Sequence, residues 1–167
     1  FRYIQTHPDM DHMGGIKDFF SCFSPINFWD TDNGKEMGSF ENSPYSEEDW
    51  DFYKDLRSGS EEDPKRLTLF SGSYGKYFNR NSNNEPGGNG LYILSPTEEL
   101  VNEANESDDY NDCSYVLLFK PSNGQKVIIG GDSHDKTWDH ILEHHESDVT
   151  NINLLIAPHH GRDSSRN

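Results

Sequence analysis

The chain has 167 residues, which is enough for one domain with a buried core and short for two. Lys and Arg total 14 against 30 for Asp and Glu, and this formal charge of −16 argues against a broad nucleic-acid-binding face. No apolar run reaches the roughly 18 residues of a membrane span, so we expect no membrane contact from this chain. Two cysteines far apart in sequence, Cys22 and Cys113, make no disulfide framework, which favours a reducing, cytoplasmic compartment.

The first thirty residues predict a strand, a helix and a second strand. The segment FRYIQT (1–6) is typical of a buried strand. Within residues 16–23 the apolar side chains recur at the spacing of one helix face, and PINFWD (25–30) predicts the next strand.

Residues 31–89 are polar and rich in Gly, Ser, Asn and Glu, and we interpret them as an insertion or a set of long loops. Within them, SEEDWDFYKDL (46–56) predicts a helix capped by its serine, and RLTLF (66–70) predicts a short strand. The segment DTDNGKEMGSFE (30–41) partly matches a calcium-binding loop, but Lys35 stands where that loop needs glycine, which favours a solvated turn.

Regular elements return after the polar region. GLYILSP (90–96) predicts a strand, a short helix follows from Thr97, and two apolar runs around an Asn-Gly pair predict a hairpin over 114–133. KTWDHILEHH (136–145) predicts a helix and NLLIAP (153–158) a buried strand. The hairpin argues against a purely parallel sheet, so we expect a mixed α/β or α+β sandwich, with α+β as the fold class, in a single domain over 1–167.

Three predicted strands end in side chains that bind metals, namely those within THPDMDHMGG (6–15), VIIGGDSH (127–134) and LLIAPHHG (154–161). One such segment alone is more often a helix cap or an exposed turn, but three in this order favour a metal site. If the three strand ends share one edge, they are enough for two ions with one shared carboxylate. The residues that would then come together are His7, Asp9, Asp11, His12, Asp132, His159 and His160.

The segments THPDMDHMGG, NDCSYVLL (111–118), IIGGDS (128–133) and APHHGRDSS (157–165) resemble the metallo-β-lactamase superfamily. More closely, they resemble the hydrolase domain attached to ComEC-type DNA-uptake proteins and its free-standing relatives. The resemblance runs from residue 6 to residue 165 and matches the polar middle only loosely. It implies an αβ/βα sandwich with a dinuclear metal site at one edge, completed by strands before residue 1 and after residue 167.

The resemblance also implies how the ligands divide between two ions that share Asp132. The implied ligand sets are His7 and Asp9 for one ion, and Asp11, His12 and one histidine of the pair His159 and His160 for the other. The sequence does not decide which histidine of that pair is the ligand.

Two positions depart from the superfamily pattern. Asp9 stands where that pattern usually has histidine, and no histidine lies between His12 and His134 to supply the usual middle ligand. Asn111 or Asp112 is the candidate to reach the metal there, directly or through water. Because carboxylate, amide and water suit manganese better than zinc, the first site should tolerate manganese.

We therefore predict a metal-dependent hydrolase that uses two divalent ions, zinc or manganese, and acts on phosphodiesters. The ions would share a hydroxide that attacks phosphorus, with Asp11 and Asp132 as catalytic ligands. His134, or the non-ligating member of His159 and His160, would protonate the leaving oxygen. The nuclease assignment rests on the resemblance alone.

The expected partner is a small phosphodiester or a nucleic-acid end, because the net charge repels a long polyanion and only Arg162 and Arg166 lie close in sequence to a motif. Fused or partner domains could extend this preference. Two alternatives stay open. One is an esterase for another phospho- or small ester, such as a phosphocholine or a cyclic nucleotide, and the other is a non-catalytic binding module that keeps the fold.

Overall fold

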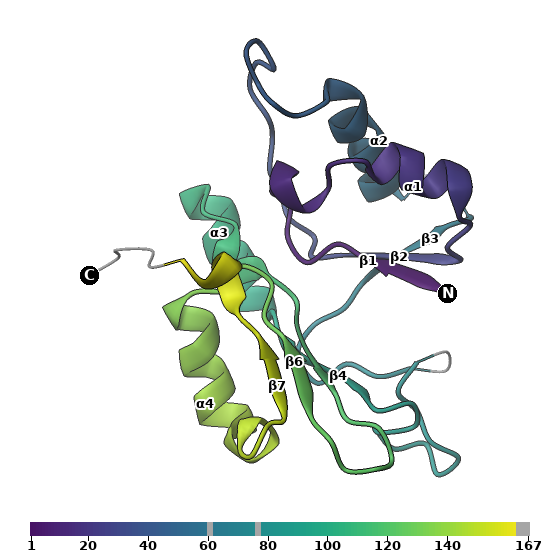
Figure 1. Ribbon diagram of the computed structural model, residues 1–167, viewed down its shortest axis with the longest axis vertical. Coiled ribbons are helices and arrows are strands. Elements are labelled where there is room, and N and C mark those ends of the chain that lie inside the picture. The colour runs from purple at the N-terminus through teal and green to yellow at the C-terminus, as the bar shows by residue number, and fades with distance from the viewer. Residues whose placement is uncertain (60–61, 76–77, 163–167) are drawn as a thin grey trace.

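Two β-sheets organise the protein, one built by the first part of the chain and one by the second (Figure 1). The computed structural model describes residues 1–59, 62–75 and 78–162, and within them the protein is α+β, with four α-helices and seven strands. The first sheet is parallel, in the order β1 (Arg2–Ile4), β2 (Asn27–Asp30) and β3 (Lys65–Thr68). The second sheet runs β4 (Leu91–Ser95), β5 (Val116–Phe119), β6 (Val127–Ile129) and β7 (Leu154–Ile156), antiparallel except for the parallel pair β6–β7.

Helices α1 (Ile16–Cys22) and α2 (Glu47–Ser58) cover the outer face of the first sheet. Helix α2 follows Ser46, carries three acidic residues in its first turn, where the helix dipole favours them, and ends at Gly59 in a left-handed conformation with φ 64°. Its apolar stripe and the start of α1 form one buried cluster with the first sheet. The buried members of that cluster are Met10, Met13, Ile16, Phe28, Trp50, Tyr53 and Leu56.

Helices α3 (Glu98–Ser107) and α4 (Asp135–Val149) belong to the second half of the chain. The hydroxyl of Thr97 accepts a hydrogen bond of 3.1 Å from the Leu100 amide and caps α3, which begins where the sequence predicts a short helix. Ile141 of α4 packs on the outer face of the second sheet with the buried residues Leu94, Val116, Leu118 and Ile128. Across residues 1–59, 62–75 and 78–162, no helix combines the length and apolar character needed to cross a bilayer.

The inner faces of the two sheets share a third hydrophobic cluster. Successive side chains of a strand point to opposite faces, so Phe28 packs under the helices while Trp29 packs toward the second sheet. The buried members between the sheets are Trp29, Phe78, Ile93, Tyr115 and Leu117. The layers therefore run helix, sheet, sheet, helix.

Two elements within the polar residues 31–89 belong to the core of the protein, whereas the sequence predicted an insertion or a set of long loops there. Strand β3 completes the first sheet by pairing with β2, and α2 supplies three of the buried residues of the first core cluster. The other described residues of 31–89 form turns, loops and isolated bridges. Tyr53 of α2 donates a 2.8 Å hydrogen bond to the buried carboxylate of Asp30, which ties the region to β2.

Two strands that the sequence predicts to be buried are not. Strand β1 is only half-buried, and the side chains of Leu154, Leu155 and Ile156 in β7 are 53%, 42% and 50% exposed. Both strands lie at the edge of their sheet, where each has a hydrogen-bonded neighbour on one side only. An apolar run in the sequence therefore predicted the strand but not its position in the sheet.

Candidate metal centre

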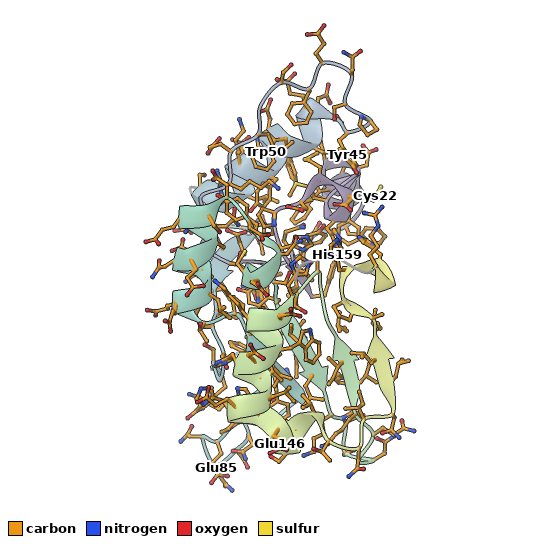
Figure 2. The ribbon with its side chains drawn as sticks, turned by 90° about the vertical axis from the view of Figure 1, so that its left-hand side faces the viewer. Cys22, Tyr45, Trp50, Glu85, Glu146 and His159 are labelled. Carbon is orange, nitrogen blue, oxygen red and sulfur yellow. The ribbon has the colours of Figure 1, made fainter. Side chains whose placement is uncertain are left out.

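The three segments that end in metal-binding side chains meet where the two sheets face each other. A short 3₁₀ turn, Met10–His12, follows β1, Asp132 follows β6, and a second 3₁₀ turn, Pro158–Gly161, follows β7. The amide of Tyr115 donates a 2.8 Å hydrogen bond to the Thr6 carbonyl and joins the halves beside the site. In Figure 2, His159 lies at the middle of the molecule, between the half that carries Trp50 and the half that carries Glu146.

On its more exposed side, Asp132 meets three other side chains, and we name these four together the open flank. They are Asp11, His12, Asp132 and His160, and they offer ligand atoms that all lie within 4.8 Å of one another. The Nε2 atoms of His12 and His160 are 3.0 Å apart, although 148 residues separate them. One oxygen of Asp132 lies 3.0 Å from His12 Nε2 and the other lies 3.4 Å from His160 Nε2.

Metal–nitrogen and metal–oxygen bonds of about 2.0–2.2 Å place tetrahedral ligand atoms roughly 3.3–3.5 Å apart. The two 3.4 Å distances from His160 Nε2 fall in this range, and the 3.0 Å distances from His12 Nε2 are slightly shorter. Asp11 completes the group, with an oxygen 3.4 Å from His160 Nε2. Oδ1 of Asp132 is buried and has no hydrogen-bond partner among the described residues, even though His12 is close. A buried carboxylate oxygen without a hydrogen-bond partner is chemically suited to binding a cation or a water molecule.

On its buried side, Asp132 meets His7 and Asp9, and we name these three side chains the closed flank. His7 is completely buried, and its Nε2 lies 3.8 Å from Asp9 and 3.9 Å from Asp132, distances too long for hydrogen bonds. Within the part of the chain that the structure describes, this nitrogen has no hydrogen-bond partner. The flank therefore also offers unsatisfied ligand atoms, at wider spacing than the open flank.

The protonation of His7 suits a metal ligand. Burial, followed by the nearby imidazole of His12, lowers the pKa of His7 to about 4, so the ring is neutral at pH 7. The Thr6 hydroxyl lies 3.1 Å from its Nδ1 and holds the ring in place. A neutral imidazole is the form that binds divalent ions.

Lys35 is a residue of the site that sequence reasoning missed. Its ammonium forms an ion pair with Oδ1 of Asp9, and its side chain is only 20% exposed. The sequence pattern around Lys35 suggested a solvated turn, because nothing local indicates that this turn packs against residues 26 positions earlier. A lone lysine in a polar stretch carries no signal that could have placed it.

His159 lies beside the open flank instead of within it. Its Nδ1 is 2.7 Å from Nε2 of His134, and the Asn111 amide nitrogen is 3.2 Å from that same atom. The structure thus separates the adjacent histidines, with His160 among the ligand atoms and His159 paired with His134.

Asp112 has a structural role at the start of α4. Its Oδ1 accepts hydrogen bonds from the amides of His134 and Thr137, at 3.0 and 3.2 Å, and from the Thr137 hydroxyl at 2.8 Å. These bonds satisfy free amides at the start of α4, so Asp112 caps that helix. The Asn111 amide is likewise directed at His134.

Backbone conformation brings the segments this close. Gly131 has φ +55°, and a Cβ there would stand 2.9 Å from Ser114 Cβ, so a larger residue would push Asp132 out of place. His159 and His160 both adopt left-handed conformations, with φ 49° and 55°. Such conformations are unfavourable for non-glycine residues and are typical of functional sites. A hydrogen bond of 3.0 Å from the His159 amide to the Gly131 carbonyl holds this turn on β6.

Of the two arginines near the last motif, Arg162 is exposed directly after the 3₁₀ turn, and Arg166 lies outside the described residues. No family model, curated protein or solved structure matches this chain. The assignment of a function therefore depends on the site itself.

Proposed function

We propose that this chain is a divalent-metal-dependent hydrolase of the metallo-β-lactamase type that acts on phosphodiesters. One observation carries the proposal. The Nε2 atoms of His12 and His160 face each other at 3.0 Å, with oxygens of Asp11 and Asp132 around them. Two imidazoles and two carboxylates in this arrangement form a donor set for zinc or manganese.

The layer order supports the fold assignment within this proposal. Helix, sheet, sheet, helix is the order that the metallo-β-lactamase resemblance implies, and the strand ends carry the site at one edge. The segments that bear the resemblance in sequence are also the segments that meet in space. This agreement supports the family assignment.

The exposure of the site suits a substrate that approaches from solvent. The side chains of His160 and Asp11 are 47% and 40% exposed, whereas those of His7 and Asp132 are 0% and 6% exposed. An ion bound at this site would activate water and neutralise charge that develops on the phosphoryl group. The chain's own contribution is to orient the substrate on the exposed side and to keep the buried ligands fixed.

His159 and His134 are placed to handle the proton that a leaving oxygen requires. The rings of His159 and His160 have centroids 6.3 Å apart, and His159 Nδ1 lies 2.7 Å from His134 Nε2. The side-chain nitrogen of Asn111 lies 3.2 Å from the same His134 nitrogen and restrains that ring. We assign the proton transfer to the pair His159 and His134.

The net charge of −16 limits the substrate. Long DNA is repelled over a screening length of roughly 8 Å at physiological salt, so attraction has to come from the bound cation and from Arg162. This balance favours small phosphodiesters and single-stranded ends over the interior of a duplex.

The experiment that tests the proposal measures metal content and turnover in the same preparation. The purified chain is stripped with a chelator, reloaded with manganese or zinc, and assayed on bis-p-nitrophenyl phosphate, single-stranded DNA and duplex DNA. We expect metal-dependent hydrolysis of the small ester and of strand ends. Hydrolysis of another ester class alone would move the assignment to that class, and metal binding without any turnover would point to a non-catalytic binding module.

A further inference from the structure

Several hydrogen bonds hold the backbone around Lys35 in place, although this residue belongs to a polar turn. Its carbonyl accepts a 2.6 Å hydrogen bond from Arg57 of α2, and its amide donates to Asn33 Oδ1 at 3.2 Å. The amide of the preceding Gly34 donates to Asn105 Oδ1 of α3 at 2.7 Å. Contacts from two helices on different sheets therefore fix the backbone of this turn.

The anchor of the turn is itself buried. Asn33 is only 5% exposed, and its side-chain amide donates to Tyr53 at 2.8 Å and to Asp30 at 3.1 Å. The Lys35 ammonium lies 5.4 Å from the centre of the Tyr110 ring, within the range of a cation–π contact. The backbone of Lys35 and its ammonium group are therefore both held in place, and the side chain extends toward Asp9.

The ammonium occupies the side of Asp9 that faces away from His7. Asp9 directs Oδ1 at Lys35 and Oδ2 toward His7 Nε2, which is 3.8 Å away. A divalent ion on the closed flank would share the Asp9 carboxylate with a positive charge on its other oxygen. The open flank has no described lysine or arginine paired with any of its carboxylates.

From these contacts we propose that the two flanks are not equivalent, and that Lys35 supplies the second positive charge of the site. The open flank binds one divalent ion tightly, and the Lys35 ammonium takes the electrostatic place of a second ion beside Asp9. From the closed flank, the Lys35 ammonium faces the anionic oxygens of a bound phosphodiester. This inference rests on the proposed function for its substrate, but its claim about metal binding stands by itself.

The size of the effect follows from Coulomb's law. A double and a single positive charge about 5 Å apart repel each other even at the dielectric constant of water. This repulsion lowers the affinity for the divalent ion by roughly tenfold. Removing the ammonium also frees the Asp9 carboxylate for a metal. Lys35→Gln should therefore tighten the second ion by about tenfold or more.

The test is a stepwise titration of the metal-stripped full chain with manganese, followed by calorimetry and by native mass spectrometry for stoichiometry. We expect the wild-type protein to bind one ion tightly and a second at least about tenfold more weakly. Lys35→Gln should narrow this gap by about tenfold, whereas Lys35→Arg, which keeps the charge, should preserve it. Lys54→Gln is the matched control, because Lys54 is an exposed lysine paired with Asp51 on α2.

Two ions of equal affinity in the wild-type protein would overturn the inference, and this measurement needs no variant. A Lys35→Gln protein that folds normally by circular dichroism, yet binds the second ion no more tightly, would overturn it as well. Failure to hydrolyse any phosphodiester would remove the proposed function but would leave the order of metal binding intact.

Discussion

The open and closed flanks of Asp132 each take two side chains from the same short motif, yet they differ in spacing, exposure and charge. The open flank brings imidazole nitrogens to 3.0 Å and is exposed to solvent through Asp11 and His160. The closed flank spaces its atoms by 3.8–3.9 Å, buries His7 completely and carries the ion pair of Asp9 with Lys35. Ligand type alone therefore does not determine how a metal-binding motif behaves.

The difference arises from what each flank receives from elsewhere in the chain. The open flank gains a second imidazole from the turn after β7, while the closed flank gains an ammonium from the turn after β2. One contribution adds a ligand and the other adds a competing cation. Four measurements test this difference between the two flanks.

Asp132→Ala removes the one carboxylate that both flanks share. We expect loss of bound metal together with a fall in activity of at least about a hundredfold, because changes even to residues behind a ligand cost about 10–100-fold. Metal content by mass spectrometry and hydrolysis of bis-p-nitrophenyl phosphate measure the two effects. Asp139→Ala, at an exposed position of α4, should leave both unchanged. If the variant kept its full metal content, Asp132 would not be a metal ligand of either flank.

The buried His7 should make the metal-stripped protein sensitive to acid. Its folded-state pKa of about 4 lies below the ordinary value of 6.5, so the unfolded chain binds the proton first as the pH falls. The free energy of unfolding should therefore decrease between pH 6.5 and pH 4, by on the order of 3 kcal/mol, with no further loss from this group below pH 4.

Urea unfolding at a series of pH values measures this decrease. His7→Gln should flatten the slope within that window, whereas His144→Gln, at an exposed position of α4, should keep it. An unchanged slope in His7→Gln would show that the closed flank is not the acid-sensitive part of the site.

His160→Ala and His159→Ala compare two adjacent residues with different contacts. His160 lies among the ligand atoms of the open flank, so its loss should weaken the tight ion by about 10–100-fold. His159 contacts His134, so its loss should leave metal affinity close to that of the wild-type protein and lower turnover instead. Isothermal titration and steady-state kinetics separate these outcomes. Equal losses of metal in the two variants would contradict the structural distinction between them.

Asp9→His acts on the closed flank alone and should have the smallest effect. An imidazole there suits zinc, and the substitution also releases Lys35, so we expect zinc to bind about tenfold more tightly. Turnover supported by manganese should fall. Unchanged affinity for both metals would mean that Asp9 does not contact the ion.

Most of the regular elements were predictable from local pattern. The Asn-Gly pair between two apolar runs predicts the β5–β6 hairpin, and acidic residues after Ser46 predict the start of α2, because turn and cap chemistry act within a few residues. Local pattern did not show that β7 is exposed or that β3 completes a sheet. Those properties depend on which elements become neighbours.

The same division holds for the site. The candidate metal-binding side chains were evident from the sequence, because the dense His7–His12 motif and the aspartate and histidines after two later strands are recognisable by their chemistry. The folded arrangement was needed to show that His160 and not His159 joins Asp11, His12 and Asp132. It also turned Asp112 into a helix cap and brought Lys35 to Asp9 across 26 residues. The physical reason is distance, since ligand geometry and charge pairing act over a few ångströms in space and leave no periodic trace along the chain.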